Sequence, residues 1–197
     1  MAMQPVPLDK ASRLLNHGPT VLVGSAHAGR INVMAAAWAM PLDFTPPKVA
    51  VVIDKATLTR ALIEASGVLS VCVPCVAQAD LTRAVGGESG KDHPDKLQRC
   101  GVTLEPGPET GCPLVQGAIA WMECRVLPAT AHVAGPHDLI LAEVVSAWAD
   151  ERVFSHGRWH FESAPDELRS LHHVAGGFFY SVGTPVVPQQ PHALGES

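Results

Sequence analysis

Residues 31–53 read INVMAAAWAMPLDFTPPKVAVVI, and this stretch is the most informative about the fold. One polar residue, Asn32, precedes three consecutive alanines that run into Trp38. The segment LDFTPP then breaks the chain, and Lys48 to Ile53 is a continuous apolar strand of the kind that is covered on both faces. A strand that only fills a core carries bulkier side chains than alanine. The stretch therefore predicts strands, with a small-residue segment beside one large aromatic side chain that needs a separate explanation.

On both sides of this stretch, the pattern predicts strands joined by turns, with a few short helices between them. The expected helices cover 9–15 and 56–67, and 77–101 is mixed helix and loop. The expected strands cover two segments of 20–40 about a turn at Ala28–Gly29, then 48–53, 68–73, 118–133, 138–154 and 158–161, while 109–116 is a turn. At least six strands with inserted helices predict a closed or partly closed barrel. The strand–helix–strand unit at 48–73 also fits the start of an α/β sheet, but it is not repeated.

Composition limits the function further. The chain has 197 residues, of which 47% are hydrophobic and 17% are charged, with a net charge of −5 and a pI near 6.0. We find no basic stripe of the kind that binds nucleic acid or an anionic membrane. The longest apolar run, Val33 to Leu42, is about half of the roughly 20 residues that a membrane helix needs. The first residues show no secretory signal, and five cysteines are an odd number, so we expect reduced thiols in the cytoplasm.

Three motifs resemble functional sites but lack a feature that such sites require. The segment GGESGK at 86–91 lacks the flanking Gly and Ser/Thr of a phosphate loop, since Val85 and Asp92 stand there. The CVPC segment at 72–75 has redox spacing, but it ends a strand rather than opening a helix, which favours a structural role. The histidine pair in HGRWH lies on a turn and strand, where i, i+4 spacing does not build a metal site. We therefore predict no metal and no catalytic side chain, and a bound cofactor that performs the chemistry.

Four segments in order resemble the flavin reductase-like domain, the FMN-binding split barrel that includes flavoredoxins. These are the stretch from Ile31 to Pro74, SGKDHPDKL at 89–97, GPHDLILAEVVSAWAD at 135–150 and LHHVAGGFFYSVG at 171–183. The second differs from the family pattern by Lys91 in place of Arg and by one extra residue. The resemblance spans about 15–183. It implies a mainly β, Greek-key type split barrel with peripheral helices over 1–183, followed by an extended tail over 184–197 that is either loose or laid across a partner subunit.

The resemblance implies a place for the flavin ring. Ala35, Ala36 and Ala37 would let ring and strand approach closely, Trp38 would pack at the ring or wall the pocket, and Asn32 would hydrogen-bond the flavin or its ribityl chain. The sequence alone leaves a second explanation open, in which the alanines only make room for a packed helix.

By the same resemblance, Thr59 contacts the phosphate at a helix start, with Thr57 beside it. Lys55, Lys91 and Lys96 are the candidate cations, Lys91 and Lys96 above all, although each is also an ordinary solvated lysine. His137 matches a turn histidine near the flavin, and His173 and Phe178 would sit where the last strand meets the ring.

The function that the resemblance implies is NAD(P)H:flavin oxidoreductase with non-covalent FMN. Members of this family are usually homodimers, and reduced flavin would pass to a partner monooxygenase or another acceptor. The alternatives are a non-enzymatic, flavoredoxin-like FMN electron carrier and a flavin-free barrel used for binding.

Overall fold

An antiparallel sheet of eight strands dominates the computed structural model, which describes residues 2–128 and 135–188. Seven strands follow the order β3-β2-β6-β9-β10-β5-β4, and β1 pairs with β10. Every pairing is antiparallel. The strands are β1 (Met3–Pro5), β2 (Val21–His27), β3 (Arg30–Ala36), β4 (Ala39–Phe44), β5 (Pro47–Val52), β6 (Val68–Val73), β9 (Ala120–Val126) and β10 (Leu139–Asp150).

The two outer strands of this path, β3 and β4, are consecutive in the chain and are joined only by Ala37 and Trp38. The sheet must therefore curl until its two edges meet, which makes a barrel that is split between β3 and β4. The curl runs through β10, whose first half pairs with β5 and whose later part pairs with β9, with a bulge between Val144 and Ser146. The expected mainly β split barrel is confirmed, and the α/β alternative is wrong because β9 and β10 separate β5 from β6.

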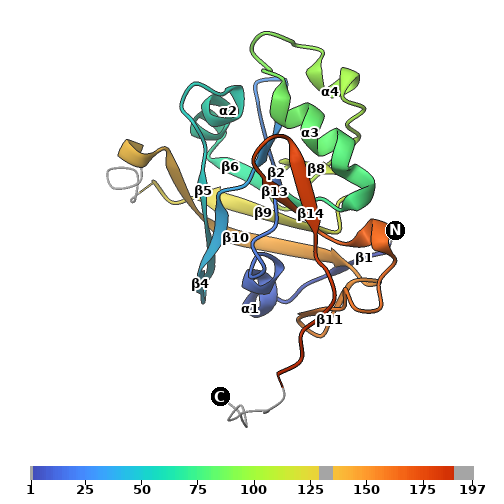
Figure 1. Cartoon of the computed structure of the whole chain (residues 1–197). Helices are drawn as coiled ribbons and strands as arrows, with labels where there is room; N and C mark the ends of the chain where they lie inside the picture. The colour runs from blue at the N-terminus through green and yellow to red at the C-terminus, as the bar shows by residue number, and fades with distance from the viewer. Residues whose placement is uncertain (1, 129–134, 189–197) are drawn as a thin grey trace.

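The helices are peripheral. Figure 1 shows α2, α3 and α4 gathered at one end of the sheet, with the β13–β14 hairpin beside α3. The helices are α1 (Leu8–Ala11), α2 (Leu58–Ser66), α3 (Ala79–Gly87) and α4 (Lys96–Arg99), with 3₁₀ turns η1 (Ser12–Leu14), η2 (Val76–Gln78), η4 (Gly135–His137) and η5 (Asp166–Leu168). Three small hairpins complete the fold: β7 (Leu104–Pro106) with β8 (Pro113–Val115), β11 (Phe154–Ser155) with β12 (Arg158–Trp159), and β13 (Leu171–Val174) with β14 (Phe178–Ser181). Across 2–128 and 135–188, none of the helices has the length and apolar character to cross a membrane.

Two apolar clusters hold the sheet. Val21 and Val23 of β2 point into the larger cluster, inside the barrel, whereas Leu22 between them points into a smaller cluster with Val85 of α3. Because strand side chains alternate, a strand that is buried on both faces reads as a continuous apolar run. The smaller cluster anchors α3 on the outside of the barrel, and α3 forms one wall of the cavity described below.

Three expectations need correction. The segment LDFTPP does not simply break the chain, because β4 continues through Phe44 and the turn follows at Thr45–Pro46. The segment 109–116 is not only a turn, since it contains β8. The first helix is divided into α1 and η1.

The predicted end of the strand at 129–133 and the tail beyond 188 lie outside the described residues. The division into a domain over 1–183 and a tail over 184–197 stays a prediction.

Candidate functional site

A cavity of about 660 Å³ opens where the barrel is split. It lies between the end of β3, the end of β5, α3 and the β13–β14 hairpin. The lining residues are Thr20, Met34, Ala35, Ala36, Ala37, Trp38, Val52, Asp54, Thr82, Arg83, Gly86, Gly87, His173, Gly177 and Phe179. Of the residues expected from the sequence, the three alanines, Trp38 and His173 are brought together here.

The floor of the cavity consists of the small residues that end β3. Alanine side chains keep the wall thin, so a flat ligand can approach the main chain closely. Trp38 follows directly and is 74% exposed, while its carbonyl accepts a hydrogen bond from Val52 N at 2.9 Å. This hydrogen bond fixes the main chain of Trp38 at the rim of the cavity, while the indole remains accessible to solvent or to a partner.

The second wall is α3, which packs directly on the floor. A Cβ atom added at Gly86 would lie 3.2 Å from Ala35 Cβ, so the missing side chain lets helix and strand touch. The alternative explanation for the alanines is therefore also correct in part: Ala35 makes room for a helix and lines the cavity. Thr82 of the same helix is fully buried, and its Oγ1 has no hydrogen-bond partner among the described residues.

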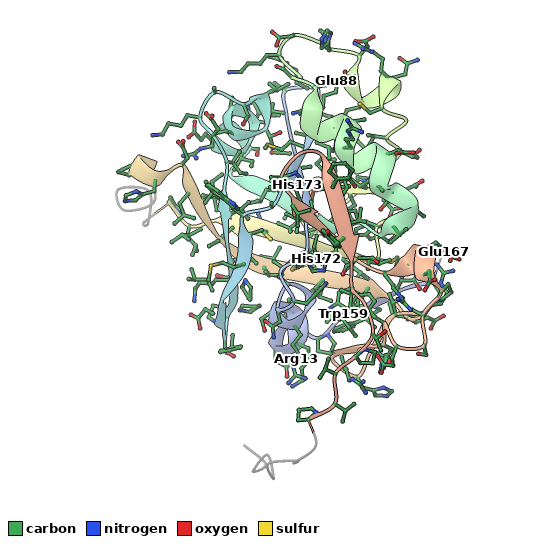
Figure 2. All side chains as sticks on the ribbon, in the orientation of Figure 1. Arg13, Glu88, Trp159, Glu167, His172 and His173 are labelled. Carbon is green, nitrogen blue, oxygen red and sulfur yellow. The ribbon has the colours of Figure 1, made fainter. Side chains whose placement is uncertain are left out.

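The third wall is the β13–β14 hairpin (Figure 2), on which His173 is labelled. Its backbone N–H donates to Thr20 Oγ1 at 2.8 Å, and its ring lies edge-on to Phe179 with centroids 5.7 Å apart. Phe179 lines the cavity, whereas the expected Phe178 does not and is 72% exposed. The strand period of two explains the difference, because neighbouring side chains point to opposite faces and a register error of one exchanges them.

The residues expected at the phosphate lie on α2 and β3. Thr57 caps α2, because its Oγ1 accepts from Arg60 N at 3.2 Å. Thr59 and Asn32 are both buried, and Asn32 Nδ2 donates to Thr59 Oγ1 at 2.8 Å. Gly90 packs against Asn32 and Leu58, since a Cβ there would lie 2.5 Å from Asn32 Oδ1 and 3.0 Å from Leu58 Cδ2. Asn32, Thr57 and Thr59 do not line the cavity, and neither do the three expected lysines.

The three lysines lie in different surroundings. Lys55 pairs with Asp138 at 3.4 Å, next to the exposed His137, and neither Lys55 nor His137 reaches the cavity. Lys91 is exposed on the loop after Gly90. Lys96 is only 2% exposed, and burial lowers the pKa of its ammonium group, while Cys100 and Glu88 nearby oppose that shift. One carboxylate oxygen of Glu88 is buried without a hydrogen-bond partner in the described chain.

The two thiols of CVPC are buried and unpaired. Burial raises the pKa of Cys72 to about 12, and Val115 N donates to its sulfur at 3.5 Å. Cys75 is 1% exposed, and burial raises its pKa as well. Thiols in this state are poor nucleophiles, so the structure favours the structural role for CVPC. Within 2–128 and 135–188, no three His, Cys, Asp or Glu side chains gather as metal ligands would.

Sequence reasoning missed the polar part of this cavity, above all Thr20, Thr82 and Arg83. The segment 77–101 was expected only as mixed helix and loop. The pair Gly86–Gly87 directly after a helical stretch was an available signal, because glycine in a helix often marks close packing.

Comparison with known proteins adds the family context. Residues 13–168 match the family described as "Flavin reductase like domain". The protein YddH of Escherichia coli (strain K12) is 50% identical over 182 residues, which cover 91% of this chain and 94% of YddH. A solved structure, an FMN-binding domain of a flavin reductases-like enzyme from Shewanella baltica, superposes with a TM-score of 0.90 at 49% identity, covering 95% of this chain and 97% of that one.

More distant relatives carry more specific names. Flavoredoxin of Desulfovibrio vulgaris superposes with a TM-score of 0.73 at 25% identity, covering 91% of this chain and 93% of that one. The FMN reductase (NADH) RutF of Variovorax paradoxus is 27% identical, covering 74% of this chain and 78% of RutF. The reductase subunit HsaB of a flavin-dependent monooxygenase from Mycobacterium tuberculosis is 32% identical, covering 53% of this chain and 51% of HsaB.

Proposed function

This chain belongs to the flavin reductase-like family, and from that premise we propose that it is an FMN-binding NAD(P)H:flavin oxidoreductase. The observation that carries the proposal is the cavity at the split of the barrel. Its floor is three consecutive alanines, and a helix and a hairpin enclose it from the other sides. A flat ring system fits a thin, small-residue wall, and a volume of about 660 Å³ is within the range of roughly 300–1,000 Å³ for small-molecule sites.

The residues present also satisfy a polar ligand. Thr82 Oγ1 is buried and unpartnered, and such a hydroxyl costs free energy until something hydrogen-bonds to it. Thr20 Oγ1 is buried and accepts from His173 N, so its own proton is still available to an acceptor in the cavity. Both hydroxyls suit a ring edge that carries carbonyl and N–H groups.

We assign the phosphate of FMN to the start of α2, where Thr59, Thr57 and the neighbouring main-chain N–H groups lie near Asn32 and Gly90. A helix N-terminus favours an anion. The candidate cations are Lys91, exposed on the loop after Gly90, and Lys96, buried on α4. The spacing supports this assignment, because Asn32 precedes the alanine floor by three residues on β3, or about 10 Å. The ribityl chain would then lie along β3 between Asn32 and the ring.

When bound, FMN would supply the redox chemistry by accepting a hydride from NAD(P)H, which would become NAD(P)⁺, and a proton from solvent. The side chains of this chain bind, orient and shield the two ligands rather than act as a general base. Trp38 lines the cavity at its rim and is largely exposed. Reduced flavin would then serve a monooxygenase or another acceptor, as the name of HsaB indicates for that relative.

We further propose a homodimer that covers the open side of the cavity. Along and just before β4, the side chains of Trp38, Met40, Leu42 and Phe44 are all exposed, between 47% and 74%. We call these four residues the β4 apolar stripe. An edge strand with an apolar surface is unusual for a monomer in water and is typical of a contact surface. Five unpaired thiols, four of them buried, also agree with a cytoplasmic location.

The alternative is a flavoredoxin-like electron carrier, which the likeness to the Desulfovibrio vulgaris protein favours. One anaerobic experiment separates the two. The FMN-loaded protein is mixed with NADH or NADPH, and the loss of oxidised flavin absorbance is followed. We expect reduction within the time of a catalytic turnover and continued NAD(P)H oxidation when free FMN is added. A protein that binds FMN tightly but is reduced only by dithionite would be a carrier. A protein that binds no FMN in a calorimetric titration would be neither.

A further inference from the structure

Arg83 stands out as a charged group in the cavity with no ion-pair partner within the described residues. It lies on α3 with its side chain exposed, and it lines the cavity beside Gly177. A Cβ added at Gly177 would lie 3.5–3.7 Å from three guanidinium-group atoms of Arg83, so the guanidinium lies against the turn of the β13–β14 hairpin. Gly177 has a φ of +79°, a conformation that also favours glycine at this turn.

Two contacts fix which end of the cavity Arg83 occupies. Gly90 packs on Asn32, and Gly86 packs on Ala35. The chain direction from Gly90 back to Gly86 therefore runs alongside the direction from Asn32 to Ala35 on β3. Arg83 lies a further three residues along α3, which is about 4.5 Å of helix rise. It is thus at the ring end of the cavity, away from Asn32 and Thr59.

An arginine at that end does not serve the FMN phosphate, which the proposed function places near Thr59. Thr82 and Arg83 also lie at different depths in the cavity. A ligand on the alanine floor reaches the buried hydroxyl of Thr82, whereas a ligand that lies above the first one reaches the exposed guanidinium of Arg83. Asp54 is the acidic residue of the lining, and its Oδ1 already accepts from Ala56 N at 2.7 Å. The charge of Arg83 is therefore available to a second, anionic ligand.

We propose that Arg83 is the specificity residue for the second substrate, and that its guanidinium binds the diphosphate of a nicotinamide dinucleotide. This inference rests on the proposed function for the identity of that substrate. Guanidinium groups pair with phosphate oxygens in a bidentate geometry that lysine does not reproduce. The nicotinamide would reach the ring over the alanine floor while the diphosphate stays at the rim, between α3 and the hairpin turn.

The test uses FMN-loaded protein and two probes. ADP-ribose carries the diphosphate but no nicotinamide, so it reports binding without reduction, by calorimetry. NADH reports reduction under anaerobic conditions. Arg83→Gln removes the charge, and Arg83→Lys keeps the charge without the bidentate geometry of the guanidinium. Arg30→Gln is a matched control at the exposed start of β3, outside the cavity.

We expect Arg83→Gln to weaken ADP-ribose and raise the KM for NADH about ten- to hundredfold, the size of a lost charged hydrogen bond. Arg83→Lys should recover part of the loss. Arg30→Gln should change neither, and FMN affinity should stay within about twofold in all variants. Added salt should weaken ADP-ribose binding to the unsubstituted protein more than to Arg83→Gln.

The inference is overturned if Arg83→Gln binds ADP-ribose as well as the unsubstituted protein, if neither binds it, or if FMN affinity falls by the same factor. A protein that binds ADP-ribose through Arg83 but is not reduced by NADH would contradict the proposed function and leave the anion site in place. If the unsubstituted protein and Arg83→Gln oxidise NADH with the same KM, the proposed function stands and the role given to Arg83 is contradicted.

Discussion

Asn32 on β3 and Thr59 on α2 are joined by a buried hydrogen bond in which Asn32 Nδ2 donates to Thr59 Oγ1 at 2.8 Å. The bond ties the first turn of α2 to the strand that leads into the alanine floor. Because Thr59 accepts from Asn32, its own hydroxyl proton is directed elsewhere, and a phosphate oxygen is a suitable acceptor. The same side chain thus serves packing and, in the proposed function, the phosphate.

Thr59→Ala should weaken FMN binding more than riboflavin binding. Riboflavin lacks the phosphate, so it loses only what the loosened strand contact contributes. A charged hydrogen bond is worth roughly 1.5–3 kcal/mol, which corresponds to about ten- to hundredfold for FMN. Fluorescence titrations with both ligands measure the difference, and Thr59→Ser is the control that keeps the hydroxyl. Equal weakening of both ligands would place Thr59 away from the phosphate.

Thr82→Val should have opposite effects on the free and the loaded protein. Valine has nearly the shape of threonine, and Thr82 Oγ1 has no partner in the described structure, so the ligand-free protein should be unchanged or more stable by up to about 1 kcal/mol. FMN affinity should fall about fivefold, since one neutral hydrogen bond is lost. Urea unfolding and a flavin titration give the two values. A destabilised free protein with unchanged FMN affinity would assign this hydroxyl to the fold instead.

The contrast between Thr82 and Ala35 shows how far the sequence alone reaches. The turn at Ala28–Gly29 is a local pattern and was predicted correctly, whereas Ala37 and Trp38, expected within the second strand, lie between β3 and β4. The segment after Leu42 misled because its two prolines indicate a break, although β4 pairs with β5 as far as Phe44. Thr82 and Arg83 were missed because their role depends on where α3 packs, which tertiary contacts decide.

The two cysteines of CVPC should be dispensable for flavin reduction. Both are buried, and burial raises the pKa of Cys72 to about 12 and also raises that of Cys75, so neither forms an accessible thiolate near neutral pH. Replacing both by alanine should lower the free energy of unfolding by about 1–3 kcal/mol through lost packing, without abolishing reduction by NADH. Loss of turnover with FMN still bound would restore a dithiol mechanism. Slow reaction of the native thiols with a disulfide reagent, and fast reaction after unfolding, is the accompanying check.

His17 should make the protein less stable in mild acid. Its ring packs against Trp159, Phe161 and His172, and burial, with the nearby His172, lowers its pKa from 6.5 to about 4. Below pH 6.5 the unfolded chain takes up this proton and the folded chain does not, so the free energy of unfolding falls as the pH drops toward 4. The loss between pH 7 and pH 5 is about 2 kcal/mol, from 1.4 kcal/mol per pKa unit.

Urea unfolding at pH 7 and pH 5 measures this loss, and His17→Gln is the comparison because glutamine does not titrate. The pKa of His172 is also lowered by burial, so it contributes in the same direction and part of the loss should remain. The carboxyl groups of Glu123 and Asp150, whose pKa values are lowered by hydrogen bonds, contribute mainly below this window. An equal pH effect in His17→Gln and the unsubstituted protein would contradict the assignment to His17.

The β4 apolar stripe should hold two copies of the chain together. Met40→Glu places a charge in the middle of this surface, where burying it without a partner is costly, so the dimer should dissociate. Met40→Leu keeps an apolar side chain and should remain a dimer. Light scattering measures both. An unsubstituted protein that scatters as a monomer refutes the dimer, and a dimeric Met40→Glu variant moves the contact to another face.

The same measurement tests the role that the sequence suggests for the tail. Val186 and Val187 are 92% and 81% exposed, which is unfavourable for two apolar side chains in water and is relieved if the segment lies along a second copy. Proline at 185 and 188 stiffens this segment, so it loses less entropy on docking. A chain truncated after Gly183 should therefore dissociate at a higher concentration than the full chain. Equal dimer affinity in both would refute the role of the tail while leaving the stripe as the contact, because Met40 and its neighbours are present in either form.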